Sequence, residues 1–380
     1  MKIEQTSWSN EKQAWTIPPP WLLAESAQLV LLFGSRALLK DGARIKDLKQ
    51  AYRNARFLGC STAGEICGRT VRDDTLAATA VHLEHTKIAG ATINIGDVPD
   101  SFHAGQKLAK AFDIKDLVHV FVLSDGMKIN GTELVKGLSK ALPPHVAVTG
   151  GLAGDGTAFG ETLVLWDEDS QPGKIVAIGF YGNRMKIGYG TFGGWDTFGI
   201  ERLITKSRGN VLYELDGKSA LALYKTYLGE HAAGLPATGL FFPLELRSVE
   251  GKRGLVRTLF AINEQDQSVT FVGAVPEGSY ARLMKANFDR LIDGAGSAAR
   301  ACQEKMVSQP PDLAVLISCV GRKMVLKQRV EEEVENVADV LGSATALTGF
   351  YSYGEICPFE PTGQCEFHNQ TMTITTFREE

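Results

Sequence analysis

The sequence predicts an α/β protein of two domains, with mixed sheets built from repeated strand–helix–strand units. Short apolar runs alternate with helix-like stretches, and every second run enters a glycine-rich turn that carries an acidic residue. One such turn, Gly-Glu-Ile-Cys, occurs at residues 64–67 and again at 354–357. A strand–helix–strand order favours a parallel pair joined by a right-handed crossover.

The unit can be followed three times along the chain. The expected first strands are 29–36, 119–126 and 313–322, and the turns are 61–66, 151–156 and 349–356. Alternating or apolar segments after each turn indicate hairpins, so the sheets should also contain antiparallel strands. A glycine-rich stretch at 191–199 marks a boundary, which predicts one domain at 26–195 and a second at 196–377.

Composition excludes several classes of protein. The net charge of −4 argues against a nucleic-acid surface, which usually shows a basic excess. No apolar run approaches the roughly 20 residues that span a bilayer, and the polar N-terminal stretch lacks the apolar core of a signal peptide. We therefore expect a cytoplasmic protein without membrane insertion, whose six cysteines are reduced thiols.

The three turns are candidate ligand-lining segments. Glycine permits close approach to the backbone, and turns at strand ends of α/β sheets often border clefts. Ser61, Glu65 and Asp155 lie in the first two turns, and Glu355 lies in the third. The alternative, of equal weight, is that these are packing turns retained from a duplication.

The third turn adds aromatic and polar side chains. Tyr351 and Tyr353 share one face of an extended strand, and Ser352 points to the other. Rings mixed with hydroxyls suit an amino acid, a carboxylate or a planar macrocycle. We expect these residues, with Glu355, His368 and Asn369, to border a binding site; the alternative for the tyrosines is packing between the two domains.

These pieces carry a family resemblance. GCSTAGEI, GGLAGDG, LYELDGKSALALYKTYLG, TGFYSYGEICPF and FHNQTMT occur in order over nearly the whole chain, which resembles FIST proteins with an N-terminal and a C-terminal FIST domain. The resemblance implies an intracellular sensor of a small ligand that acts on a separate signalling protein. Stand-alone proteins of this size look like the NosP type, which implies haem b, nitric oxide as the signal and a histidine kinase as partner.

An axial haem ligand must be His, Cys, Met or Tyr in an apolar pocket. His368 is the candidate, because its strand can place it beside the third turn; the alternative is a core histidine bound to the backbone. His119 and His145 each begin a strand, and we expect both at the rim of the sheets.

Cys67 and Cys357 occupy the same place in the two Gly-Glu-Ile-Cys turns, so pseudo-symmetric packing would let the thiols approach each other. With Cys60 and Cys365 they would offer a metal or redox site, although the C-x6-C and C-x7-C spacings are not those of common zinc sites. Small buried thiols are the alternative.

We do not expect an enzyme. No serine lies in G-x-S-x-G, and GGLAGDG lacks the Lys-Ser/Thr pair of a P-loop. Three functions remain in order: a haem-based nitric-oxide sensor, a sensor of an amino-acid-like or other small polar metabolite, and a cysteine-based redox or metal sensor.

Overall fold

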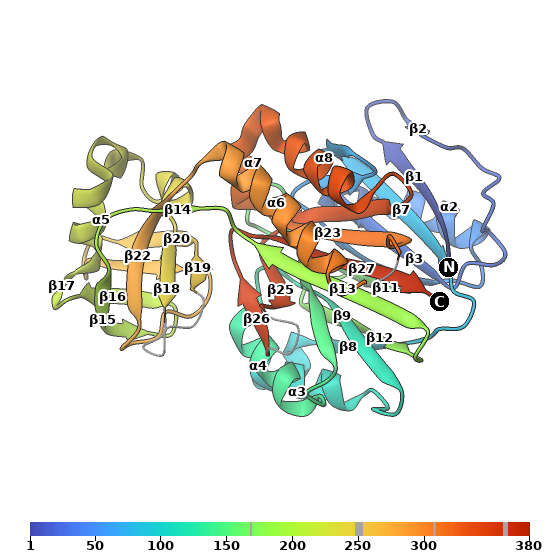
Figure 1. Ribbon diagram of the computed structural model, residues 1–380, viewed down its shortest axis with the longest axis horizontal. Coiled ribbons are helices and arrows are strands. Elements are labelled where there is room, and N and C mark those ends of the chain that lie inside the picture. The colour runs from blue at the N-terminus through green and yellow to red at the C-terminus, as the bar shows by residue number, and fades with distance from the viewer. Residues whose placement is uncertain (168, 248–253, 307–308, 360–363) are drawn as a thin grey trace.

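The chain forms a larger body, which holds both termini, and a small domain beside it (Figure 1). The computed structural model describes residues 1–167, 169–247, 254–306, 309–359 and 364–380. The mixed α/β class predicted from the sequence is confirmed. None of the helices in these described parts of the chain is long and apolar enough to cross a bilayer.

Three copies of one unit build the larger body. Each copy has two parallel strands joined through one or more helices, as the sequence predicted. The pairs are β3 (Leu29–Gly34) with β4 (Arg56–Ser61), β9 (Leu117–Ser124) with β10 (Ala147–Leu152), and β23 (Leu313–Cys319) with β24 (Ala346–Ser352). The crossovers are α1 (Arg36–Asp41) and α2 (Ala43–Ala51); α4 (Gly131–Ala141); and α7 (Val320–Leu326), η4 (Lys327–Arg329) and α8 (Val330–Leu341).

Two antiparallel strands complete each unit on the side of its first strand. These are β7 (Thr75–His82) and β1 (Lys2–Ser9), β12 (Lys174–Tyr181) and β8 (Lys87–Asn94), and β27 (Met372–Glu379) and β13 (Met185–Phe192). The resulting orders β4-β3-β7-β1, β10-β9-β12-β8 and β24-β23-β27-β13 are the same in space and in chain direction. The strand registers fix the equivalent positions of the three units. The corresponding pairs are Gly34 with Leu76, Ser124 with Ile175, and Ser318 with Met372.

The segment that follows each turn leaves its own unit and joins the sheet of another. These segments are β5 (Glu65–Cys67) with β6 (Thr70–Arg72), β11 (Val164–Trp166), and β25 (Gly354–Pro358) with β26 (Cys365–His368). β5 pairs with β24, β25 pairs with β10, and β11 pairs with β4. The three six-stranded sheets therefore close into a ring with approximate threefold symmetry, and strand pairing ties residues before 195 to residues after it.

The same glycine recurs in the second parallel strand of each unit for a steric reason. A Cβ atom at Gly59, Gly150 or Gly349 would collide with the carbonyl oxygen of the first strand, at Leu32, Val122 and Leu316 respectively. The repeat of glycine in the sequence thus reflects a close approach of two backbones, which only glycine permits.

The apolar core fills the inside of the ring, and the helices cover its outside. Phe33, Leu123, Ile317 and Phe350 pack around the axis, with the Phe33 and Phe350 rings stacked 4.8 Å apart. Outside the sheets lie α3 (Ser101–Lys110) with α4, and α6 (Phe288–Gln303) with α8. His119 is 1% exposed, so its predicted place at the rim is wrong. It shares the inward face of β9 with Phe121, and Thr149 Oγ1 lies 2.8 Å from its Nε2.

The small domain is inserted into the third unit, between β13 and α6. Its strands run in the order β19 (Leu255–Arg257), β18 (Leu244–Arg247), β22 (Tyr280–Lys285), β15 (Arg202–Arg208), β16 (Val211–Leu215), β21 (Ser268–Phe271), β20 (Leu259–Asn263). Its helices are α5 (Ala220–Leu228), η2 (Gly229–Gly234) and η3 (Ala237–Phe241). The short elements β2 (Ala14–Trp15), η1 (Ile95–Asp97), β14 (Asp196–Thr197) and β17 (Lys218–Ser219) complete the chain. Tyr224 and Phe271 lie at the centre of the core of the small domain.

Candidate functional site

The three glycine-rich turns meet one another around the axis of the ring. Ala63 N donates to Tyr351 O (2.8 Å), and Tyr351 N donates to Gly64 O (2.8 Å). Gly154 N donates to Ser61 O (2.9 Å), and Tyr353 N donates to Leu152 O (3.3 Å). Each turn thus binds the end of a strand from another unit, which gives the repeated turn a structural purpose.

The two glutamates of the repeated turn make the same hydrogen bonds. Glu65 accepts from Thr62 Oγ1, from Thr75 N (3.0 Å) and from Thr75 Oγ1 (2.7 Å). Glu355 accepts from Ser352 Oγ (2.7 Å), from Thr371 N (3.2 Å) and from Thr371 Oγ1 (2.9 Å). Each carboxyl therefore fastens the start of the last strand of its own unit, β7 or β27.

Burial dominates the protonation of both glutamates. It raises the pKa of Glu65 to about 7 and that of Glu355 to about 8, although the donated hydrogen bonds act in the opposite direction. The Asp73 carboxylate raises the pKa of Glu65 further, whereas the Arg322 guanidinium lowers that of Glu355. Both glutamate side chains are thus buried groups that bind the fold itself.

In the second unit a different acidic residue fastens the start of the last strand, β12. Gly156 stands where the other units have glutamate, and Asp125 at the end of β9 accepts instead from Gly173 N (2.9 Å), Met127 N (2.8 Å) and Lys128 N (2.7 Å). Sequence reasoning missed Asp125; its signal was an acidic residue directly after a buried strand. Asp155, which was predicted to line a ligand, accepts from Gly160 N and Glu161 N (both 2.9 Å).

The predicted aromatic residues are bound inside the protein. Tyr351 donates to Glu333 Oε1 (2.6 Å), and Glu333 pairs with Arg322 (2.7 Å), with both charged side chains fully buried. Burial raises the pKa of Tyr351 well above its usual range. The Tyr353 hydroxyl bonds to Asp155, and its ring stacks on Phe159 at 4.7 Å. Tyr353 therefore packs against the second unit, whereas the Tyr351 hydroxyl is bound by Glu333 of its own unit.

Ser61 and Ser352 also have partners within the fold. Ser61 Oγ accepts from Leu163 N (2.9 Å), at the point where β11 joins the first sheet. Ser352 Oγ donates to Glu355 within the third turn. Both hydroxyls thus hold backbone segments or turns in place.

Among the metal candidates, His368 and Cys357 lie close together, whereas Cys67 lies in a different sheet. His368 is 1% exposed, its Nε2 lies 2.8 Å from Cys357 O, and its ring meets Phe359 edge-on at 4.5 Å. Cys67 lies beside β24 of the third sheet, whereas Cys357 lies beside β26 of the second. Burial raises the pKa of Cys67 to about 11 and that of Cys357 further. In the described chain, no group of three or more His, Cys, Asp and Glu is placed to hold a metal.

Two adjacent amides stand out because their oxygens are buried and unsatisfied. Asn369 and Gln370, 1% and 0% exposed, form the turn between β26 and β27. Asn369 Nδ2 donates to His368 O (2.9 Å) and Gln370 Nε2 to Leu240 O (3.4 Å). Asn369 Oδ1 and Gln370 Oε1 have no hydrogen-bond partner among the described residues. An unsatisfied buried group costs about 1–3 kcal/mol, so two neighbours require an explanation.

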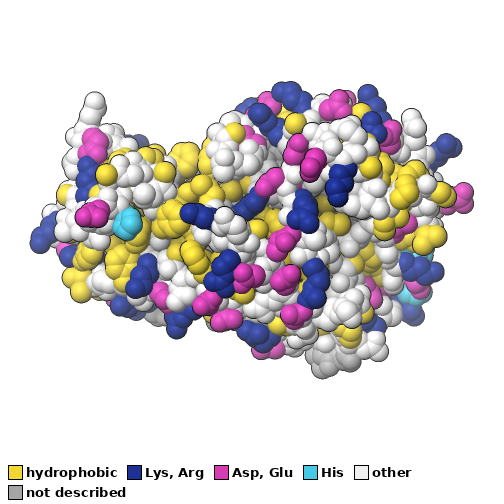
Figure 2. Space-filling model, turned by 90° about the horizontal axis from the view of Figure 1, so that it is seen from above, with side chains coloured by type: hydrophobic (Ala, Val, Ile, Leu, Met, Phe, Trp, Pro, Cys, Tyr) yellow, Lys and Arg dark blue, Asp and Glu magenta, His cyan; other side chains and the backbone are white. Residues whose placement is uncertain are grey.

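The small domain covers this turn. Leu240 belongs to its η3, and Arg257 of β19 donates to Phe367 O (3.1 Å) two residues before Asn369. Arg257 is 2% exposed, and burial lowers its pKa to about 10. Trp195, at the start of the connection to the small domain, donates to Gln370 O (2.9 Å). Figure 2 shows an indentation between the small domain and the larger body, with hydrophobic side chains gathered beside it.

We call the group of Arg257, Glu355, Asn369, Gln370 and Thr371 the junction site. Sequence reasoning named Glu355 and Asn369 as candidates, but it did not name Gln370 or Arg257. The unusual left-handed backbone of Gln370, with φ of 63°, left no mark in the sequence. Arg257 comes from an inserted domain, so only the tertiary structure brings it to the turn.

The structure thus combines a ring of three interlocked units with a small domain that lies over one turn. The FIST N domain model matches residues 28–218, and the FIST C domain model matches residues 220–358. The chain therefore belongs to the FIST family. FIST domains are small-ligand sensory domains of signalling proteins.

Individual relatives add little to the family assignment. The uncharacterized protein MJ1623 of Methanocaldococcus jannaschii is 24% identical over 336 residues, which are 81% of this chain and 62% of that protein. This chain thus matches less than two thirds of the relative's length. A crystal structure of cyanuric acid hydrolase from A. caulinodans aligns over 100% of this chain and 99% of its own, with a TM-score of 0.38 and 8% identity. A TM-score this low supports no conclusion about this chain.

Proposed function

We propose that this protein senses a small polar ligand at the junction site and passes the signal to a separate signalling protein. The observation that carries the proposal is the pair of buried amide oxygens on Asn369 and Gln370. A ligand that donates hydrogen bonds to them would remove an energetic cost that the free protein bears.

The charges around the junction site favour an amino-acid-like ligand. The two amide oxygens are acceptors that suit ammonium or amide N–H groups. Arg257 is a buried cation that currently donates to the carbonyl oxygens of Ala274, Val256 and Phe367, and it suits a carboxylate. A ligand that carries both kinds of group would bridge the turn and the small domain.

The position of the site suggests how the signal leaves it. Arg257 and Leu240 belong to the small domain, whereas Asn369 and Gln370 belong to the ring. A ligand between them would change how the small domain sits on the ring, and a partner that contacts both would read the difference. We propose that this is binding without chemistry, because Ser61 and Ser352 serve as hydrogen-bonding groups of the fold.

Haem-based sensing of nitric oxide, with a histidine kinase as partner, is the narrower alternative. The described residues do not fit haem as they stand. His368 already bonds to Cys357 O and packs on Phe359, so it would have to leave both before it could bind iron. An absorption spectrum of protein expressed with iron and a haem precursor tests this alternative directly: a stoichiometric Soret band that shifts with nitric oxide would establish it.

The junction site itself is tested by a thermal-shift screen of the twenty amino acids and common polyamines against the full chain. A ligand that acts at the junction should raise the melting temperature of the wild type and have little effect on Asn369→Leu or Gln370→Met. Both variants keep side-chain size and remove the amide, so we expect them to fold.

The matched control is Asp73→Ala. Asp73, in the exposed turn of the first unit, is equivalent to Asn369 of the third unit. The Asp73→Ala variant should therefore respond to the ligand like the wild type. Equal shifts in the wild type, both amide variants and the control would place the ligand elsewhere and overturn the proposal, as would the absence of any hit.

A further inference from the structure

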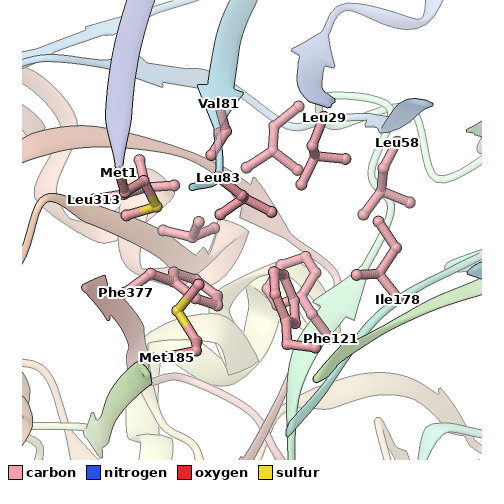
Figure 3. A pocket seen from close by; sticks show the side chains of 13 residues that line it. Met1, Leu29, Leu58, Val81, Leu83, Phe121, Ile178, Met185, Leu313 and Phe377 are labelled. Atoms are coloured by element: carbon pink, nitrogen blue, oxygen red, sulfur yellow. The ribbon is translucent and has the colours of Figure 1, made fainter. Parts of the chain in front are cut away.

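A small apolar cavity lies inside the ring, away from the turns and the junction site. Its lining side chains come from all three sheets and point toward a common centre (Figure 3). They are Met1, Leu29, Leu31, Leu58, Val81, Leu83, Phe121, Ile178, Phe180, Met185, Leu313, Val315 and Phe377. The cavity thus belongs to the ring as a whole.

The approximate symmetry explains why the space is left open. The strand registers make Val81, Phe180 and Phe377 equivalent positions. Each lies five residues after the equivalent paired residue of its strand, which is Leu76, Ile175 or Met372. Two of the three positions carry a phenylalanine ring and the third carries valine. Nearer the turns the axis is filled by Phe33 and its neighbours, so the space is confined to one layer of the core.

The cavity is apolar and small. Its volume is about 20 Å³, which is room for little more than one water-sized sphere, since a single water needs about 10–15 Å³ on this measure. All its lining side chains are aliphatic, aromatic or thioether groups, so a water molecule inside would lack hydrogen-bond partners. Cavities of this kind stay dry and accept small apolar molecules.

Two methionines help to close the cavity. The Met1 side chain is 1% exposed, and the neighbouring Leu83 and Met185 are 4% exposed. Methionine side chains are unbranched and flexible, so they can move aside without moving the strands. Ionic contacts hold the Met1 backbone nitrogen beside Glu379 and Glu84, at 3.6 and 3.7 Å, which leaves the side chain as the moving part.

We propose that this cavity is a binding site for one small apolar molecule of the size of a dissolved gas or a very short hydrocarbon. It is independent of the proposed junction site, which takes a polar ligand on the other side of the turns. His119, which packs against the lining residues Phe180 and Phe377, already bonds to Thr149. All the lining side chains are apolar, so the ligand needs no hydrogen-bonding groups.

Xenon is the probe. The full chain, labelled at its methyl groups, is titrated with xenon under pressure and followed by NMR. We expect saturable shifts in the methyl signals of Met1, Met185, Ile178 and Val315, with methyl groups of the small domain unchanged. Shifts that do not saturate, or that spread evenly over the molecule, would overturn the proposal.

Two variants and a control sharpen the test. Val81→Phe places at the third position the ring that its two equivalents already carry, and it should abolish the xenon shifts. Val315→Ala should enlarge the cavity and raise xenon affinity, and this result stands even if Val81→Phe fails to fold. Val337→Ala removes the same atoms from a buried position outside the cavity and should leave the shifts as in the wild type. If xenon affinity is the same in Val315→Ala and Val337→Ala, the assignment is wrong.

Discussion

The turn of the first unit and the turn of the third unit use the same device in opposite surroundings. Glu65 and Glu355 each bond to a hydroxyl three residues earlier and to the threonine at the start of the last strand, Thr75 in β7 or Thr371 just before β27. Beyond the first turn, Asp73 is exposed and pairs with Lys323. Beyond the third turn, the equivalent Asn369 lies beneath the small domain.

The difference teaches how an inserted domain changes the chemistry of a repeated turn. Asp73 and Asp74 in the first unit correspond to Asn369 and Gln370 in the third. Asp74 and Gln370 have the same left-handed backbone, with φ of 55° and 63°. Carboxylates tolerate the exposed turn, but an unpaired carboxylate under the small domain would be costly, and neutral amides stand there instead. A shared backbone motif is thus a structural device, and the departure from it marks the candidate site.

The largest effect should come from the buried ion pair between Arg322 and Glu333 in the third unit. Arg322 occupies the position that Leu38 has in the first unit. It pairs with Glu333, and both side chains are fully buried. Arg322→Leu leaves Glu333 as an uncompensated buried charge, which should cost about 3–5 kcal/mol of unfolding free energy. Urea denaturation at pH 7 measures it.

The double variant Arg322→Leu with Glu333→Leu serves as the control for that charge. It removes both charges and should recover most of the lost stability. If the double variant is as unstable as the single one, then packing of the arginine, rather than its charge, distinguishes the third unit.

The second effect concerns pH. An ordinary glutamate in the unfolded chain titrates near 4.5, whereas folding raises the pKa of Glu355 to about 8 and that of Glu65 to about 7. The stability that each group contributes is complete below pH 4.5, where both states are protonated. It falls as the pH rises toward the folded pKa, by up to about 1.4 kcal/mol per pH unit for each group.

Glu355→Gln and Glu65→Gln test this pH dependence separately. Glutamine keeps an oxygen for the threonine donors and cannot ionise. Unfolding free energies between pH 4.5 and 8 should fall less steeply in either variant than in the wild type, and the range of flattening should extend to higher pH for Glu355→Gln. Parallel curves for the wild type and both variants would show that neither carboxyl is protonated in the folded protein.

The smallest effects come from exchanging the equivalent turn residues. Asn369→Asp places a carboxylate under the small domain and should lose about 1–3 kcal/mol at pH 7, with less loss at pH 4.5. The reciprocal Asp73→Asn lies on the exposed turn and should stay within about 0.5 kcal/mol of the wild type. Thermal unfolding at the two pH values compares them, and equal losses in the two variants would remove the distinction between exposed and covered turns.

The sequence by itself determined the local elements. The apolar runs, the helix-like stretches and the repeated glycines predicted three parallel strand pairs with crossovers, because these patterns reflect burial and backbone contact within about 40 residues. The sequence also indicated a common role for Glu65 and Glu355, because the same turn sequence occurs twice. It left open whether those residues face a ligand or the protein.

Only the tertiary structure decided how the units meet and what each turn residue touches. The segments after the three turns exchange cyclically among the three sheets. Edge strands pair through backbone groups, so no side-chain pattern identifies the partner strand. For the same reason Cys67 and Cys357 look alike in sequence and lie in different sheets. Gln370 and Arg257 were brought to the same turn because an inserted domain folded over it. Their burial depends on the whole fold, so the sequence could not reveal it.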